Sequence, residues 1–242
     1  MNFLAEFGPD LTAFAASAAI IGAYYLFLGF KVRQNPTYTI HGVNELARTL
    51  WVAHVMRTAG DNVMAVQTLR NFIMGAILMA TTASMLIIGT LTLSGQVENI
   101  ARSWHALSLG GSHAAELWII KVLSLLVVFI VAFFAFTMCV RLSNHVLFML
   151  NVKNNEAHPC FSPAAVARRL CRAGNLFAIG MRAFFFAIPL VFWLFGPVFL
   201  FLASVALVVT LYHLDRTESD DAAGGKLQEI GSPTPIKLQK RS

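Results

Sequence analysis

Five long runs of apolar residues constrain the fold of this chain more than any other feature of its sequence. The runs cover residues 11–30, 71–94, 117–140, 176–195 and 198–214. Each reaches or approaches the ~20 residues that a helix needs to cross ~30 Å of hydrocarbon. Backbone polar groups find no water inside a bilayer, so runs of this kind fold as helices. The sequence therefore predicts an all-α fold, a polytopic helical membrane bundle of about five transmembrane helices over residues 1–214.

Composition separates this prediction from a soluble helical protein. Of the 242 residues, 57% are hydrophobic and 12% are charged, whereas a soluble domain carries about twice that charged fraction. We therefore expect one membrane domain and no separate soluble domain. Residues 215–242 are polar, with glycine, proline and mixed charge, and we expect them to form a cytoplasmic tail.

The segments between the runs contain recognisable helix boundaries. Residues 42–58 are too charged to span, so they predict an interfacial or cytoplasmic helix, either in the membrane interface or packed beneath the bundle. Asp61 is suited to cap the start of the second spanning helix. Ser162 followed by Pro163 predicts the start of the fourth, because serine caps a helix and proline is tolerated at its first position.

Residues 176–214 can be arranged in two ways. As one helix these 39 residues would measure about 58 Å, which is too long for a single crossing. The tripeptide Phe195-Gly196-Pro197 interrupts them, since glycine allows a sharp turn and proline breaks the hydrogen-bond ladder. We favour two antiparallel spans, with Trp193 at the outer interface. The alternative is a re-entrant hairpin, which would place the C-terminus on the other side of the membrane.

The distribution of lysine and arginine predicts the orientation. The formal net charge is +6, and the cations gather beside the apolar runs, which excludes nucleic acid as the expected partner and favours the positive-inside rule as their cause. Residues 31–70 and 141–182 hold most of the cations near the spans, whereas the opposite side has only Arg102 and Lys121. We therefore expect a multi-pass protein of the cell inner membrane, with its N-terminus outside and its C-terminus in the cytoplasm.

The inner ends of three spans carry the candidate binding residues. Acidic residues are absent from 62–97, 117–155 and 157–214, so the cations there have no carboxylate on their own helices. At helical spacing the candidates are Gln67, Arg70 and Asn71; Arg141, Asn144 and His145; and Arg172, Asn175 and Arg182. If these faces converge, they form a ring of donors suited to an anion or a lipid headgroup. The alternative is that the arginines are orientation anchors that reach headgroups.

Lys121 is a second candidate, because it lies one turn inside the outer end of the third span. It either extends outward to the headgroups or pairs with Glu116 or Glu98.

The remaining residue patterns indicate no catalytic or metal chemistry. The seven histidines form no haem or metal pattern, and the three cysteines lie outside any CxxC motif. No phosphate-binding loop, dinucleotide-binding glycine pattern or nucleophile elbow is present. We expect no cofactor, no metal and no catalytic residue.

Several segments together resemble a known family. They include AVQTLRNFIMGAILMATTA at 65–83 and GMRAFFFAIPLVFWLFGPVFLF at 180–201. The sequence resembles the domain-of-unknown-function family numbered 599, which comprises bacterial and plant integral membrane proteins. The resemblance implies a helical membrane fold and supplies no activity. Its motif positions include Gln67, Arg70, Asn71, Lys121, Arg141, His145, Arg182, Pro189, Trp193, Gly196 and Pro197.

These observations lead to two function hypotheses. The first is a homo-oligomeric pore or transporter for a small anion or anionic metabolite, based on the arginine-rich inner faces. The second is a structural or accessory subunit of a membrane complex, which binds anionic membrane lipids or a partner through its basic cytoplasmic face. An enzyme is the least favoured class.

Overall fold

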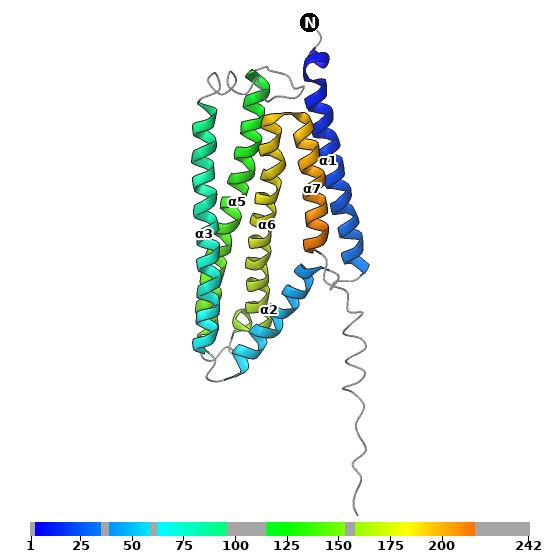
Figure 1. The fold of residues 1–242 in the computed structure, drawn as a ribbon. Helices are drawn as coiled ribbons and strands as arrows, with labels where there is room; N and C mark the ends of the chain where they lie inside the picture. The colour runs from blue at the N-terminus through cyan, green and yellow to red at the C-terminus, as the bar shows by residue number, and fades with distance from the viewer. Residues whose placement is uncertain (1–2, 35–38, 59–61, 96–114, 153–157, 216–242) are drawn as a thin grey trace, which may run out of the picture.

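The structure is a computed structural model that describes residues 3–34, 39–58, 62–95, 115–152 and 158–215. Within these ranges the chain is helical and contains no strands (Figure 1). The helices are α1 (Phe3–Gln34), α2 (Ile40–Arg57), α3 (Asn62–Ser94), α5 (Ala115–Leu150), the short 3-10 helix η2 (Pro159–Phe161), α6 (Pro163–Phe195) and α7 (Pro197–Asp215).

Five of these helices are long and apolar enough to cross a membrane, namely α1, α3, α5, α6 and α7. The shortest, α7, has 19 residues and is therefore about 28 Å long, close to the thickness of the hydrocarbon core. Helix α2 is not among them. The predicted class, a polytopic helical membrane bundle with one additional helix, is confirmed.

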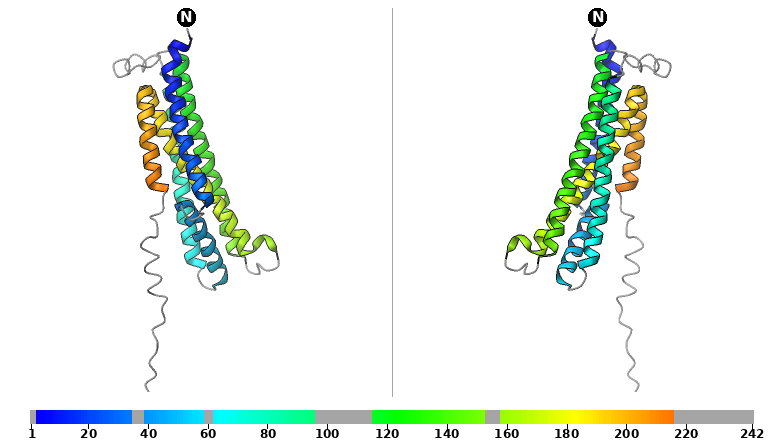
Figure 2. Two further views of the ribbon diagram at one scale, coloured as in Figure 1. Left: turned by 90° about the vertical axis from the view of Figure 1, so that its right-hand side faces the viewer. Right: turned by 90° about the vertical axis from the view of Figure 1, so that its left-hand side faces the viewer.

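The helices run up and down in one bundle (Figures 1 and 2). The N-terminus and the turn between α6 and α7 lie at one end of the bundle. Helix α2 lies at the other end, together with the start of α3, the end of α5 and the start of α6. We call this second end the basic end, because it carries Arg48, Arg141 and Arg168.

Small and aromatic residues join the central helices. The most extensive helix contacts are those of α5 with α6 and of α3 with α5. Ala83 of α3, Ala132 and Phe136 of α5, and Ala183 of α6 form one buried cluster between them. Small residues allow helix backbones to approach closely, which drives helix association in lipid. Large apolar side chains such as Leu26 point outward and are exposed, as expected of a surface that faces lipid.

The predicted boundaries at both ends of α6 are confirmed. The Ser162 hydroxyl accepts a hydrogen bond from the Ala165 backbone N–H, and Pro163 is the first residue of the helix. At the other end, Gly196 has a φ of 148°, a conformation that favours glycine. Its N–H donates to the Trp193 carbonyl, and α7 begins at the next residue. The chain therefore reverses direction within one residue.

The first spanning helix differs from its predicted bounds. It begins at Phe3 rather than at residue 11, and it includes Pro9 and Asp10. Pro9 is the seventh residue of this helix, so it lies inside the helix and leaves one backbone carbonyl without its intrahelical N–H donor. Trp193 also differs from expectation, because it is buried between helices instead of facing the outer interface. The predicted cap at Asp61, most of the polar segment 95–116 and the tail after Asp215 lie outside the described residues.

Cysteine labelling tests whether α6 and α7 both cross the membrane. Val198 is exposed beside the turn, and native Cys160 is exposed at the basic end, whereas Cys139 and Cys171 are buried. The two proteins to compare are the unaltered protein, labelled at Cys160, and the V198C/C160S variant, labelled at residue 198. We expect a membrane-impermeant maleimide to reach these two cysteines from opposite sides of the membrane. Labelling of both from the same side would establish the re-entrant hairpin.

Candidate functional site

A basic cavity lies where η2 joins α6. It measures about 400 Å³ and is lined by Pro159, Cys160, Ala165, Arg168, Arg169 and Arg172. The three arginines are exposed, and no acidic residue lines this cavity among the described residues. Arg169 Nη1 donates to the Met149 sulfur of α5 at 2.8 Å, which fixes one side of the cavity. Three guanidinium groups on two turns of one helix provide donors suited to phosphate oxygens.

The nine predicted ring residues lie on α3, α5 and α6. On α3, Gln67, Arg70 and Asn71 are exposed, as are Arg141, Asn144 and His145 on α5. On α6, Arg172 is exposed and lines the basic cavity, whereas Asn175 and Arg182 are partly buried. Only Arg172 of the nine therefore contributes to the basic cavity. A ring shared by all three helices stays a prediction.

Arg182 has a carboxylate partner, contrary to the prediction of a ring without one. Its Nη2 lies 3.6 Å from Oδ1 of Asp215, the last residue of α7. The Tyr24 hydroxyl of α1 donates to Oδ2 of the same carboxylate at 2.9 Å. The Arg182 guanidinium also lies over the Tyr25 ring, 5.5 Å from its centroid. Arg182 therefore joins α6 to α1 and α7, and sequence reasoning missed this because Asp215 was assigned to the tail.

His41 of α2 lies near this ion pair. Burial and the positive charges of Arg182 and Arg48 lower the pKa of His41 below its ordinary value, against smaller opposing effects of Glu45 and Asp215. A neutral histidine is consequently favoured here. Arg182 and Arg48 therefore both lie close enough to His41 to disfavour its charged form.

The opposite end of the bundle contains a buried ion pair that the sequence analysis did not predict. Asp10 is 0% exposed and Lys121 is 5% exposed. Lys121 Nζ lies 2.8 Å from Asp10 Oδ1, and Trp193 Nε1 donates to the same oxygen at 2.9 Å. The Lys121 ammonium also lies 5.4 Å from the centroid of the Trp193 ring. Lys121 therefore pairs with Asp10, whereas Glu98 and the side chain of Glu116, which were the predicted partners, lie outside the described part of the chain.

The signal for this pair was present in the sequence. Asp10 and Lys121 are opposite charges that border or interrupt apolar runs on two different spans. Ionisable residues in spans commonly pair with one another. Residue 10 was instead placed before the first span, so the two charges were not compared.

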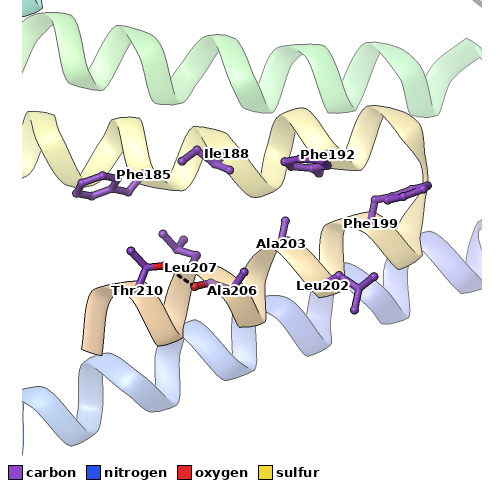
Figure 3. Close-up of a pocket in the computed structure, with 9 residues that line it drawn as sticks. All are labelled: Phe185, Ile188, Phe192, Phe199, Leu202, Ala203, Ala206, Leu207 and Thr210. Carbon is purple, nitrogen blue, oxygen red and sulfur yellow. Dashed lines mark hydrogen bonds between the residues drawn. The ribbon is translucent and has the colours of Figure 1, made fainter. Parts of the chain in front are cut away.

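An apolar cavity of about 400 Å³ lies between α6 and α7 (Figure 3). Phe185, Ile188 and Phe192 of α6 face Phe199 and other apolar residues of α7. The hydroxyl of Thr210 donates to the Ala206 carbonyl at 2.9 Å within its own helix. The cavity therefore offers an almost wholly apolar wall, which fits a hydrocarbon chain rather than a polar substrate.

The fold and these sites define a multi-pass helical membrane protein with one strongly basic end. A profile of the family described as "Protein of unknown function, DUF599" matches residues 12–220. The chain belongs to this family, as its sequence motifs indicated. Searches of curated proteins and of solved structures found no match.

Proposed function

We propose that this protein is an accessory subunit of the inner membrane that binds phosphate groups of anionic phospholipids at its basic end. The observation that carries this proposal is the basic cavity, where Arg168, Arg169 and Arg172 converge at one helix start. Guanidinium groups bind phosphate oxygens in pairs, and each cation near an anionic membrane surface contributes about 1 kcal/mol. Exposed Arg70 and Arg141 extend the positive surface at the same end.

Helix α2 supports a membrane surface as the ligand. It exposes the apolar residues Ile40, Val43, Leu46 and Leu50, which recur every three or four positions along one face. Its other face packs through Val52 and Val55 against α6. A helix with one exposed apolar face beside basic residues is suited to lie at the level of the lipid headgroups. By the positive-inside rule, this end faces the cytoplasm and the N-terminus lies outside.

The basic cavity can be tested by neutralising two arginines that make no other described contact. We expect R168Q/R172Q to weaken binding of phosphatidylglycerol by about 30-fold, since two cations contribute about 2 kcal/mol. The measurement is native mass spectrometry of the purified protein titrated with the lipid, with phosphatidylcholine as the neutral reference. Raising the salt concentration should weaken binding by the unaltered protein.

The matched control is R33Q/R57Q, which removes the same charge from exposed positions at the same end but outside the basic cavity. We expect only a several-fold loss from these changes, because surface charges are screened. Equal losses in the two variants would show a diffuse attraction to the whole basic end, and the cavity would then have no specific role.

A homo-oligomeric anion pore is the second candidate. A groove of about 250 Å³ between α3 and α5 is lined by Thr81, Ser84 and Thr137 among apolar residues. These hydroxyls could line a pore if a second copy covered the groove. However, Thr81 and Thr137 each donate to a carbonyl of their own helix. Chloride or phosphate flux through proteoliposomes of the purified protein would favour this candidate over the accessory subunit.

A further inference from the structure

The contact between α2 and α6 changes character along its length. Towards the end of α2, Val52 and Val55 pack against Val166 and Leu170 of α6 in an apolar cluster. Towards its start, the same face of α2 presents His41 and Arg48, spaced seven residues apart, to α6. The polar part of this contact is separate from the basic cavity, since none of its residues lines that cavity.

Arg48 lies in a recess that glycine provides. A Cβ atom added to Gly174 of α6 would lie 2.5 Å from Cζ and 2.6 Å from Nη1 of Arg48. Any larger residue at this position would therefore displace the guanidinium. Although Arg48 as a whole is partly exposed, its Nε and Nη2 atoms are buried and have no hydrogen-bond partner. Glu45, one turn earlier in α2, forms no ion pair with Arg48 among the described residues.

A second unpartnered polar atom lies on the same side of α6. Asn175 Oδ1 is buried and accepts no hydrogen bond. Asn175 shares a helical stripe with Cys171, four residues earlier, whose sulfur lies 3.6 Å from the Thr49 hydroxyl of α2. The helix face that carries Cys171 and Asn175 therefore points towards α2, and Arg48 points from α2 towards α6. Burying a charged donor and an amide acceptor without partners costs several kcal/mol, so a polar partner that the described residues do not supply would stabilise this contact.

We propose that a phosphate group occupies this position between α2 and α6, accepting hydrogen bonds from Arg48 while a hydroxyl of the same ligand donates to Asn175. Guanidinium binds phosphate oxygens in a planar, bidentate manner. The asparagine oxygen adds a requirement for a donor, which a glycerol phosphodiester headgroup and dihydrogen phosphate both provide. Phosphatidylcholine lacks such a donor and is excluded. This inference does not depend on the basic cavity, because the two positions share no residue.

The test compares R48Q with R57Q, a matched change at an exposed position of the same helix. We expect R48Q to lose ten-fold or more in affinity for its ligand and R57Q to lose less than two-fold, because hydrogen bonds to a charged group are strong. G174A keeps the arginine and fills its recess, so it should weaken binding in the same manner as R48Q. The probes are phosphatidylglycerol and inorganic phosphate, each titrated into purified full-length protein and followed by native mass spectrometry.

The two probes separate the two sources of phosphate. If R48Q weakens binding of phosphatidylglycerol, and inorganic phosphate does not displace this lipid from the unaltered protein, the ligand is a lipid. If inorganic phosphate displaces the lipid, the ligand is the free ion. If R48Q and G174A bind both probes as the unaltered protein does, the unpartnered atoms bind water only and the proposal is wrong. R168Q/R172Q is measured in the same experiment. A loss of binding in R168Q/R172Q but not in R48Q would contradict this proposal and support lipid binding at the basic cavity, and the reverse result would do the opposite.

Discussion

Replacing Asp10 by asparagine is expected to lower the free energy of unfolding by about 3–5 kcal/mol, because it leaves a buried lysine without its counter-charge. Asp10 and Lys121 are almost completely buried, and their charged atoms are 2.8 Å apart. Asparagine has nearly the same shape and keeps an oxygen that can accept from Trp193, so the substitution removes the negative charge with little change in packing. The measurement is the unfolding of purified protein in mixed micelles with increasing dodecyl sulfate.

The double variant D10N/K121M separates the ion pair from the packing around it. A methionine has nearly the same length as lysine without its charge, so the double variant should recover most of the lost stability. The W193F variant keeps both charges but removes the hydrogen bond to the carboxylate and part of a buried ring that lies over Lys121, and it should cost about 1.5–3 kcal/mol. If D10N alone were as stable as the unaltered protein, the Lys121 ammonium would have to reach water, and its burial in the bundle would be wrong.

The spanning helices could be predicted from the sequence because the length of each uncharged apolar run determines whether it crosses the membrane. A run of about 20 uncharged apolar residues has few alternatives to crossing a membrane. The turn at Gly196 and the start of α6 at Ser162 were also predictable, since glycine and serine act locally through backbone conformation and capping.

The polar contacts were harder to predict because they join residues far apart in the chain. Asp10 and Lys121 are 111 positions apart, and Tyr24 and Asp215 are 191 apart. Local spacing identified stripes of arginine and amide residues on single helices, but it could not show which stripes face one another. Arg48 illustrates this limit, because its recess exists only where Gly174 of another helix lies opposite.

The two ends of the bundle differ in how charge is neutralised. Lys121 at the N-terminal end has a carboxylate within the protein, and Arg182 has one near the basic end. Arg48, Arg168 and Arg172 have no carboxylate partner among the described residues. Two of these three are exposed, so anionic lipid or solvent ions can balance them, whereas Nε and Nη2 of Arg48 are buried without a hydrogen-bond partner. This difference is the reason for proposing that an anion binds at the basic end.

The second large effect is expected at Gly180, where α6 approaches α5 most closely among the described glycines. A Cβ atom at this position would lie 2.6 Å from Cζ and 2.7 Å from Cε1 of Phe136. Phe136 is completely buried, with its ring centroid 5.5 Å from that of Phe177 and 5.4 Å from that of Phe184. Because two other rings enclose this buried ring, we expect α5 and α6 to move apart to admit the new Cβ. We expect G180A to lower the free energy of unfolding by about 1–3 kcal/mol, measured in the same mixed micelles.

The control for this prediction is G75A in α3, where an added Cβ meets no atom within 4 Å. Alanine favours helix over glycine by about 1 kcal/mol, so G75A should leave the protein as stable or stabilise it. The loss of stability expected for G174A lies between those of G75A and G180A. The flexible guanidinium of Arg48 can move away from the new Cβ, whereas the enclosed ring of Phe136 cannot. Combining G180A with F136L should restore much of the stability, since leucine removes the atoms that the new Cβ would meet. If G180A instead proved as stable as G75A, α5 and α6 would lie farther apart in the membrane than the structure places them.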